Sequence, residues 1–180
     1  MALNKGKRRL FLALWPDENV RRQLFAVLSR GGHLMSIDGS PVKHENLHMT
    51  LLFLGDVHAG EAINLITSLD NVVFAPFDMA IDRWGYFHKP GILWLGATEN
   101  PDELNQLYKQ IKRIVARYLN GVSNNQFKPH ISLLRNAKSL PQVNDFEAID
   151  WHVNSFVLVE SKLRPDGVEY TVLQEWHSEI

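Results

Sequence analysis

Two short stretches of this sequence repeat the same order of side chains, and the repetition limits the folds open to the chain. Residues 46–55 read NLHMTLLFLG and residues 128–135 read KPHISLLR, so each has a histidine, an apolar residue, a hydroxyl residue and a leucine. Because alternate side chains of a β-strand point to opposite faces, His48, Thr50 and Leu52 are predicted to share one face. The opposite face is apolar and holds Leu47, Met49 and Leu51.

The second copy changes how the first is interpreted. A single His-x-Thr motif on a strand is common, and an isolated histidine there usually has a structural role. Two copies in matching contexts favour a functional site. Ser132 supports this interpretation, since serine, unlike threonine, is not a favoured strand residue. A half-domain duplicated about a pseudo-twofold axis would place the two strands side by side, with His48 and His130 in one cleft.

A competing interpretation concerns residues 44–48, which read HENLH and match the HExxH pattern of zinc metalloproteases. That pattern holds a metal only on a helix, where residues four apart face the same way. Here Pro41 favours extended backbone at Ser40, and the β-forming sequence MTLLFLG follows. We therefore expect a strand after residue 46 and no metal site.

Composition bounds the class of protein. With 180 residues, 45% of them hydrophobic and 22% charged, the chain is expected to form one domain over residues 1–180. A net charge of -1 gives no sign of a broad basic surface, so a nucleic-acid partner would be held by an end or as a fragment. The lack of cysteine excludes disulfides and favours a cytoplasmic protein. The apolar stretch LFLALW is too short to span a membrane or to form a signal peptide.

The pattern of apolar residues predicts an α+β fold, because strands and helices alternate without a regular βαβ repeat. A first strand is expected at residues 8–15, and a helix then runs from Pro16 to a stop at Gly31 and Gly32. The later elements are predicted as a strand at 47–55, a helix at 60–69, strands at 77–87 and 92–98, a helix at 101–118, and strands at 127–135, 151–158 and 169–173.

The paired motifs HMTLLFLG and FKPHISLLR, with RRLFLALW near the start, resemble the 2H phosphoesterases. The resemblance is greatest to the bacterial RNA 2′,3′-cyclic phosphodiesterases, once called 2′-5′ RNA ligases, and extends over nearly the whole chain. It implies a two-lobed, pseudo-twofold duplicated fold, with antiparallel sheets around a central cleft and helices on the outside. Ser132 replaces the threonine that is commoner in the family and keeps the hydroxyl group.

Hydrolysis of a cyclic phosphodiester needs one acid and one base, and two histidines with pKa values near 6.5 can supply both near neutral pH. The resemblance implies that His48 protonates the ribose 3′ oxygen and that His130 activates water, although pseudo-symmetry permits the reverse. Thr50 and Ser132 are predicted to donate hydrogen bonds to the phosphate. The resemblance makes Arg135 a contact to phosphate or base.

Phe11 is a candidate for stacking beneath the base, with a place in the core as the alternative. The substrate implied is an RNA end or nucleotide that bears a 2′,3′-cyclic phosphate and is opened to a 2′-phosphate, with a slow reverse reaction that forms 2′-5′ bonds. The alternatives are a phosphodiesterase for 2′-5′ oligonucleotides or other small cyclic phosphates, and a non-catalytic nucleotide-binding module. We expect a monomer with no cofactor, no metal, no membrane contact and no obligate protein partner.

Overall fold

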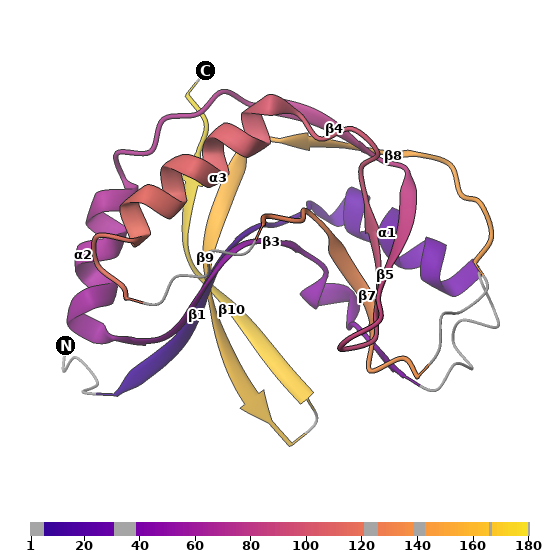
Figure 1. Ribbon diagram of the computed structural model, residues 1–180, viewed down its shortest axis with the longest axis horizontal. Helices are drawn as coiled ribbons and strands as arrows, with labels where there is room; N and C mark the ends of the chain where they lie inside the picture. Colours follow the sequence, from indigo (N-terminus) through magenta and orange to yellow (C-terminus); the bar gives the residue numbers. More distant parts are fainter. Residues whose placement is uncertain (1–5, 31–38, 121–125, 139–142, 166, 180) are drawn as a thin grey trace.

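The computed structural model describes residues 6–30, 39–120, 126–138, 143–165 and 167–179, and Figure 1 shows the arrangement of the elements. The predicted α+β class is confirmed. The predicted helix stop at Gly31 and Gly32 lies outside the described residues. In chain order the elements are β1 (Lys7–Leu14), α1 (Glu18–Arg30), β2 (Ser40–Pro41), the single 3₁₀ turn η2 (His44–Asn46), β3 (Met49–His58), α2 (Ala59–Leu69), β4 (Phe77–Ile81), β5 (Arg83–Phe87), β6 (Ile92–Gly96), α3 (Asp102–Val115), β7 (Ile131–Arg135), β8 (Ile149–Val153), β9 (Ser155–Arg164) and β10 (Gly167–His177).

The two motif strands lie side by side in the middle of one large sheet. Its strand order is β10-β9-β1-β3-β7-β6-β5, with β2 also paired to β7, and its neighbouring strands run antiparallel. β3 and β7 meet where Met49 is opposite Ile131. On either side, the succession β1-α1-β3 is matched by β6-α3-β7. The repeated motif therefore lies within a repeated strand-helix-strand order in the sheet.

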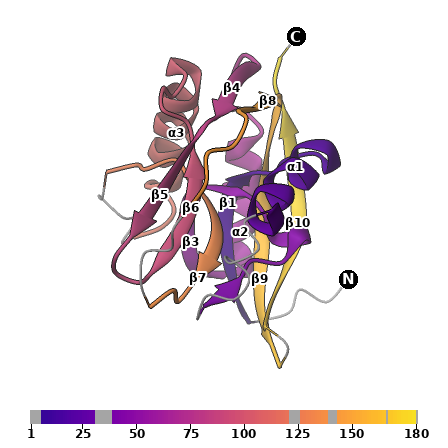
Figure 2. The ribbon, with the colours of Figure 1, turned by 90° about the vertical axis from the view of Figure 1, so that its right-hand side faces the viewer.

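One face of this sheet carries the main core. Leu10, Leu12 and Leu14 of β1 are fully or almost fully buried there, together with side chains from α1, α2 and α3. The opposite face, called the site face below, carries a smaller cluster formed by Phe11, Ala13, Val157 and Val159. Figures 1 and 2 show α2 and α3 beside the sheet, with the β9–β10 hairpin extending away from them. Within the described residues, no helix has the length and apolar character needed to cross a membrane.

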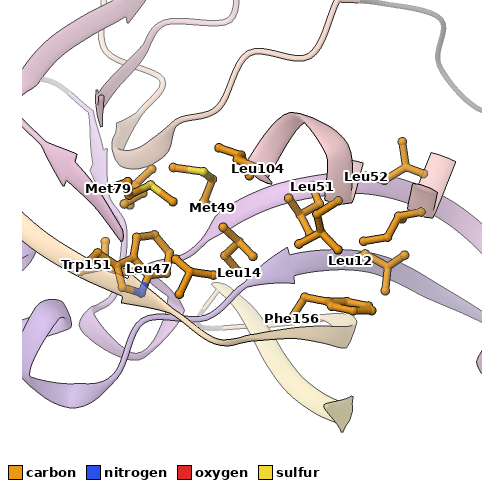
Figure 3. Close-up of a cluster of buried hydrophobic side chains, with 14 of the residues drawn as sticks. Leu12, Leu14, Leu47, Met49, Leu51, Leu52, Met79, Leu104, Trp151 and Phe156 are labelled. Carbon is orange, nitrogen blue, oxygen red and sulfur yellow. The ribbon is translucent and has the colours of Figure 1, made fainter. Parts of the chain in front are cut away.

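A β-bulge changes the predicted pattern of β3. Thr50 pairs with Ala13 and Leu52 pairs with Leu12, so Leu51 is an extra residue in the ladder. Leu51 and Leu52 both enter the core, as Figure 3 shows. The prediction that Leu52 shares the face of His48 and Thr50 is wrong for this reason.

Two predicted strands are each divided into two strands that join different sheets. The segment 77–87 breaks at Asp82, whose N–H donates to the carbonyl of Gly96 (3.1 Å) and whose carboxylate accepts from the N–H of Thr98 (2.7 Å). The segment predicted at 151–158 breaks at Asn154, whose carbonyl accepts from the N–H of Ser178 (2.8 Å). The first halves, β4 and β8, pair with each other in a separate two-stranded sheet.

Candidate active site

His48 lies at the entrance to β3 and is held at both ring nitrogens. Its Nδ1 is 2.6 Å from the carbonyl oxygen of Asn46, and its Nε2 is 3.1 Å from Oγ1 of Thr50. A carbonyl can only accept a hydrogen bond, so Nδ1 carries a proton and Nε2 is the atom that can exchange one. In the neutral ring, Nε2 accepts from the Thr50 hydroxyl. The side chain is nearly buried, with 7% of the residue exposed.

His130 has the same arrangement in the second copy of the motif. Its Nδ1 donates to the carbonyl oxygen of Lys128, again two residues earlier, at 2.7 Å. The two copies of the motif therefore share the hydrogen bond that fixes the histidine tautomer. Ser132 follows on β7, is buried, and lies opposite Trp94 of β6.

Aromatic rings surround both histidines and set their orientation. The Trp15 ring stacks on His48 with centroids 5.4 Å apart, and Tyr170 meets His48 edge to face at 5.3 Å. Phe87 contacts the ring of His130 at 4.9 Å. Trp15, Tyr170 and Phe87 were not predicted from the sequence. Trp15 could have been found by alternation, because it continues the series of Phe11 and Ala13 one residue beyond the end of β1 and packs against them.

Phe11 lies next to the site, but in a supporting position. Its ring centroid is 4.9 Å from that of His48, and only 2% of the residue is exposed. A base could not reach the face of a ring that is covered in this way. The base-stacking role considered for Phe11 is therefore corrected to one of packing beneath His48.

The zinc interpretation of HENLH does not fit the geometry. Residues 44–46 form a single 3₁₀ turn, and the chain then becomes extended. Nε2 of His44 lies 3.6 Å from the Glu18 carboxylate, whereas Nε2 of His48 faces Thr50, so the two imidazoles do not converge. In the part of the chain that the structure describes, no group of three His, Asp or Glu side chains is placed to hold a metal ion.

The surroundings of both histidines favour the neutral imidazole. Burial lowers the pKa of His48 from 6.5 to about 4, outweighing the hydrogen bond to Asn46, and the positive charges of Arg135 and His130 act in the same direction. Burial also lowers the pKa of His130, again assisted by the charge of Arg135 and opposed by the hydrogen bond to Lys128. Arg135 thus lies close enough to act electrostatically on both imidazoles.

If these two histidines are the acid and the base, kcat/KM is expected to peak below pH 6.5. The profile of kcat/KM reports the pKa values of the free protein, and its maximum lies between those of the acid and the base. Both values are lowered from 6.5, so activity falls as the pH rises through neutrality. Steady-state rates on a cyclic mononucleotide between about pH 4 and 9 test this. An optimum above pH 7 would contradict the proposed pair.

Two open pockets are lined by residues that contact His48. One, of ≈ 410 Å³, is lined by Asn46, Arg135 and Tyr170 among others. The other, of ≈ 360 Å³, shares Arg135 and Tyr170 and extends along β1 and β3. A separate cavity of ≈ 520 Å³ lies between α1 and residues 144–149 and has no site residue in its lining. The two pockets that share Arg135 are therefore the candidate binding site for the substrate.

An antiparallel sheet with this duplicated histidine and hydroxyl pair at its centre is the architecture of a two-histidine phosphoesterase. Residues 14–94 match the family described as LigT like Phosphoesterase. An RNA 2′,3′-cyclic phosphodiesterase from Escherichia coli is 31% identical to the chain, covering 94% of this chain and 96% of that protein. The corresponding protein from Archaeoglobus fulgidus is 30% identical over 92% of this chain and 98% of its own length. The chain belongs to the LigT-like phosphoesterase family.

The solved structures agree with this assignment. The crystal structure of E. coli LigT complexed with 3′-AMP superposes with a TM-score of 0.87 at 30% identity, covering 96% of this chain and 98% of that one. A crystal structure of a phosphoesterase gives a TM-score of 0.88 with the same coverage. The family predicted from the paired motifs is therefore confirmed, and so is the fold class.

Proposed function

We propose that this protein hydrolyses RNA ends bearing a 2′,3′-cyclic phosphate to the 2′-phosphate, using His48 and His130 as its acid and base. The observation that carries the proposal is the matched pair of imidazoles, each with Nδ1 fixed by a carbonyl two residues earlier. The curated relatives with this name and the 3′-AMP complex of E. coli LigT support the substrate class.

In the proposed reaction, His130 takes a proton from water as the water oxygen attacks phosphorus. The bond from phosphorus to the ribose 3′ oxygen breaks, and His48 gives its proton to that oxygen. The products are a 3′-hydroxyl and a 2′-phosphate, and the two histidines end with exchanged protonation states. For His48 to begin as the acid, the bound phosphate anion has to raise its pKa from about 4 by favouring the charged imidazolium.

The hydroxyls of Thr50 and Ser132 are proposed to donate to the non-bridging phosphate oxygens. Thr50→Val and Ser132→Ala are each expected to lower kcat by about tenfold to a hundredfold, since a preorganised donor stabilises charge that develops in the transition state. Thr50 also contacts Nε2 of His48, so its variant should change the pH profile as well. Ser132→Thr keeps the hydroxyl and is the matched control. Equal rates for wild type and both variants would exclude these hydroxyls as phosphate contacts.

The direct test is an assay of purified protein on a short RNA ending in a 2′,3′-cyclic phosphate, in the presence of EDTA, with separation of 2′- and 3′-phosphate products. The proposal predicts the 2′-phosphate alone. A 3′-phosphate product would reverse the regiochemistry. Loss of turnover in EDTA that returns with zinc would overturn the metal-free mechanism.

Assays on the same purified protein distinguish two alternative functions from this proposal. A phosphodiesterase for 2′-5′ oligonucleotides or other small cyclic phosphates would use the same histidines, so a substrate panel separates it from the main proposal. A non-catalytic binding module would bind nucleotides without turnover on any of them. We also propose a cytoplasmic monomer that forms one domain of two pseudo-symmetric lobes, with weak reversible 2′-5′ ligation as a side activity.

A further inference from the structure

The two site histidines donate from Nδ1 to the same kind of acceptor, but that acceptor is held differently in the two copies of the motif. In each copy it is the backbone carbonyl two residues earlier, which belongs to Asn46 in the first copy and to Lys128 in the second. The residue between the acceptor and the histidine is Leu47 in the first copy and Pro129 in the second. The two copies therefore reach one hydrogen-bond geometry by different means.

Proline gives the second copy a stiff backbone. Its ring fixes φ at about -65° and restricts the preceding residue, here Lys128, to extended conformations. Leu47 has a closely similar φ of -68°, with ψ at 121°, but no ring that imposes it. Its side chain is buried in the core, where Figure 3 shows it, and its N–H donates to the carbonyl of His44 at 3.3 Å. In the first copy, noncovalent contacts thus hold the peptide that carries the acceptor.

Asn46 supplies one of these contacts with its own side chain. Its Nδ2 donates to the backbone carbonyl of Val168 at 3.0 Å, which joins the η2 turn to the start of β10 across 122 residues of sequence. Asn46 is 8% exposed, and a buried amide that loses its partner is destabilising, so this hydrogen bond is expected to persist in solution. One residue therefore contacts β10 through its amide and His48 through its carbonyl.

β10 also contacts His48 directly, through a residue two positions after Val168. The ring of Tyr170 packs on the site face against Phe11, with centroids 5.0 Å apart. The same ring meets that of His48 edge to face at 5.3 Å. The start of β10 thus contacts both the residue that accepts from Nδ1 and the imidazole ring itself.

We propose that Asn46 is a positioning residue for His48, and that its hydrogen bond to Val168 does for the first histidine what Pro129 does for the second. The inference rests on the proposed function, because it assigns a role within the same site. While the Asn46 carbonyl faces Nδ1, the proton of the neutral ring stays there and Nε2 is free to exchange one with the substrate. Without the amide contact the carbonyl can turn away, and the neutral ring can then carry its proton on Nε2 instead.

The test is NMR of the ring nitrogens in the wild type and in Asn46→Ala, at a pH above both histidine pKa values. The wild type should carry the proton on Nδ1 in both rings. In Asn46→Ala, His48 should show a mixture of tautomers, whereas His130 should keep the wild-type tautomer and so controls for a general loosening of the fold. Asn71→Ala is the matched control variant, because the Nδ2 of Asn71 also donates to a backbone carbonyl, that of Thr67, at an exposed position.

Turnover of a cyclic mononucleotide gives a second measurement. Asn46→Ala should lower kcat by about tenfold to a hundredfold, the loss expected when a catalytic group is displaced by about 1 Å, and KM should change much less. Asn46→Asp keeps the shape of the side chain but, as a carboxylate, cannot donate to Val168, so its kcat should fall as well. Asn71→Ala should keep the wild-type kcat.

A folded Asn46→Ala in which His48 keeps the wild-type tautomer would overturn the inference, as would an equal change in both histidines or a loss confined to KM. The wild type alone provides a test that needs no variant, because rapid exchange of the Asn46 Nδ2 protons with solvent would also overturn it. Failure of the proposed function gives a different result, namely a wild type without turnover. The NMR measurement then still decides whether Asn46 fixes the tautomer of His48.

Discussion

Replacing either His48 or His130 with alanine is expected to reduce kcat/KM by about a hundredfold to ten thousandfold, the usual contribution of a general acid or base. His48→Ala removes the proposed acid and His130→Ala removes the proposed base, and the proposed mechanism has no second group for either proton transfer. The double variant should be little worse than the poorer single variant, because the two groups act in one step.

The controls for this prediction concern folding. His48 is almost buried, so His48→Gln should accompany His48→Ala, to separate a lost proton donor from a cavity. His177, whose side chain is 68% exposed and lies outside the site, provides a histidine variant that should retain full activity. Circular dichroism and thermal unfolding establish that each variant is folded. A folded double variant with the wild-type rate would exclude the assigned site.

The same variants can assign the acid and the base. A phosphodiester with a 4-nitrophenyl leaving group needs no proton from the enzyme, so the variant that lacks the acid should recover most of its rate on that substrate. The proposed roles predict recovery for His48→Ala and none for His130→Ala. Recovery by His130→Ala alone would reverse the roles. That reversal would agree with the strong burial of His48, which disfavours its charged form.

The paired motifs predicted the central feature of the fold because they combine a local and a global constraint. Alternation along a strand correctly places His48 and Thr50 on one face, and duplication explains why β3 and β7 are neighbours. The Leu52 error has a physical cause. A bulge depends on how a strand pairs with its partner, and an apolar run such as Leu51-Leu52 looks the same with or without one.

The remaining differences also arise from tertiary structure. The apolar alternation breaks at Asp82-Arg83 and at Asn154-Ser155, where two polar residues come together, but such a break does not show that the chain moves to another sheet. Tyr170 reaches the site only because β10 folds back along β9, far from either motif in sequence. Phe11 was considered for base stacking because aromatic rings can do this, and only the surrounding side chains show that its faces are covered.

Arg135→Ala is expected to lower kcat by about a hundredfold to a thousandfold, because a positioned cation stabilises the charge that develops on the phosphate. It should also move the pH optimum of kcat/KM upward. The positive charge of Arg135 lowers the pKa of both His48 and His130, so its removal makes both easier to protonate. The two effects have one origin and should appear in the same variant.

Arg135→Lys separates the charge from the shape of the side chain. Lysine keeps the positive charge, so the pH optimum should stay close to that of the wild type, but an ammonium group cannot form the paired hydrogen bonds of a guanidinium. Its kcat should therefore fall between those of the wild type and Arg135→Ala. The measurement is kcat and kcat/KM against pH for the three proteins on one cyclic mononucleotide. If Arg135→Ala lowers the rate without moving the optimum, Arg135 contacts the substrate but does not control the protonation of the histidines.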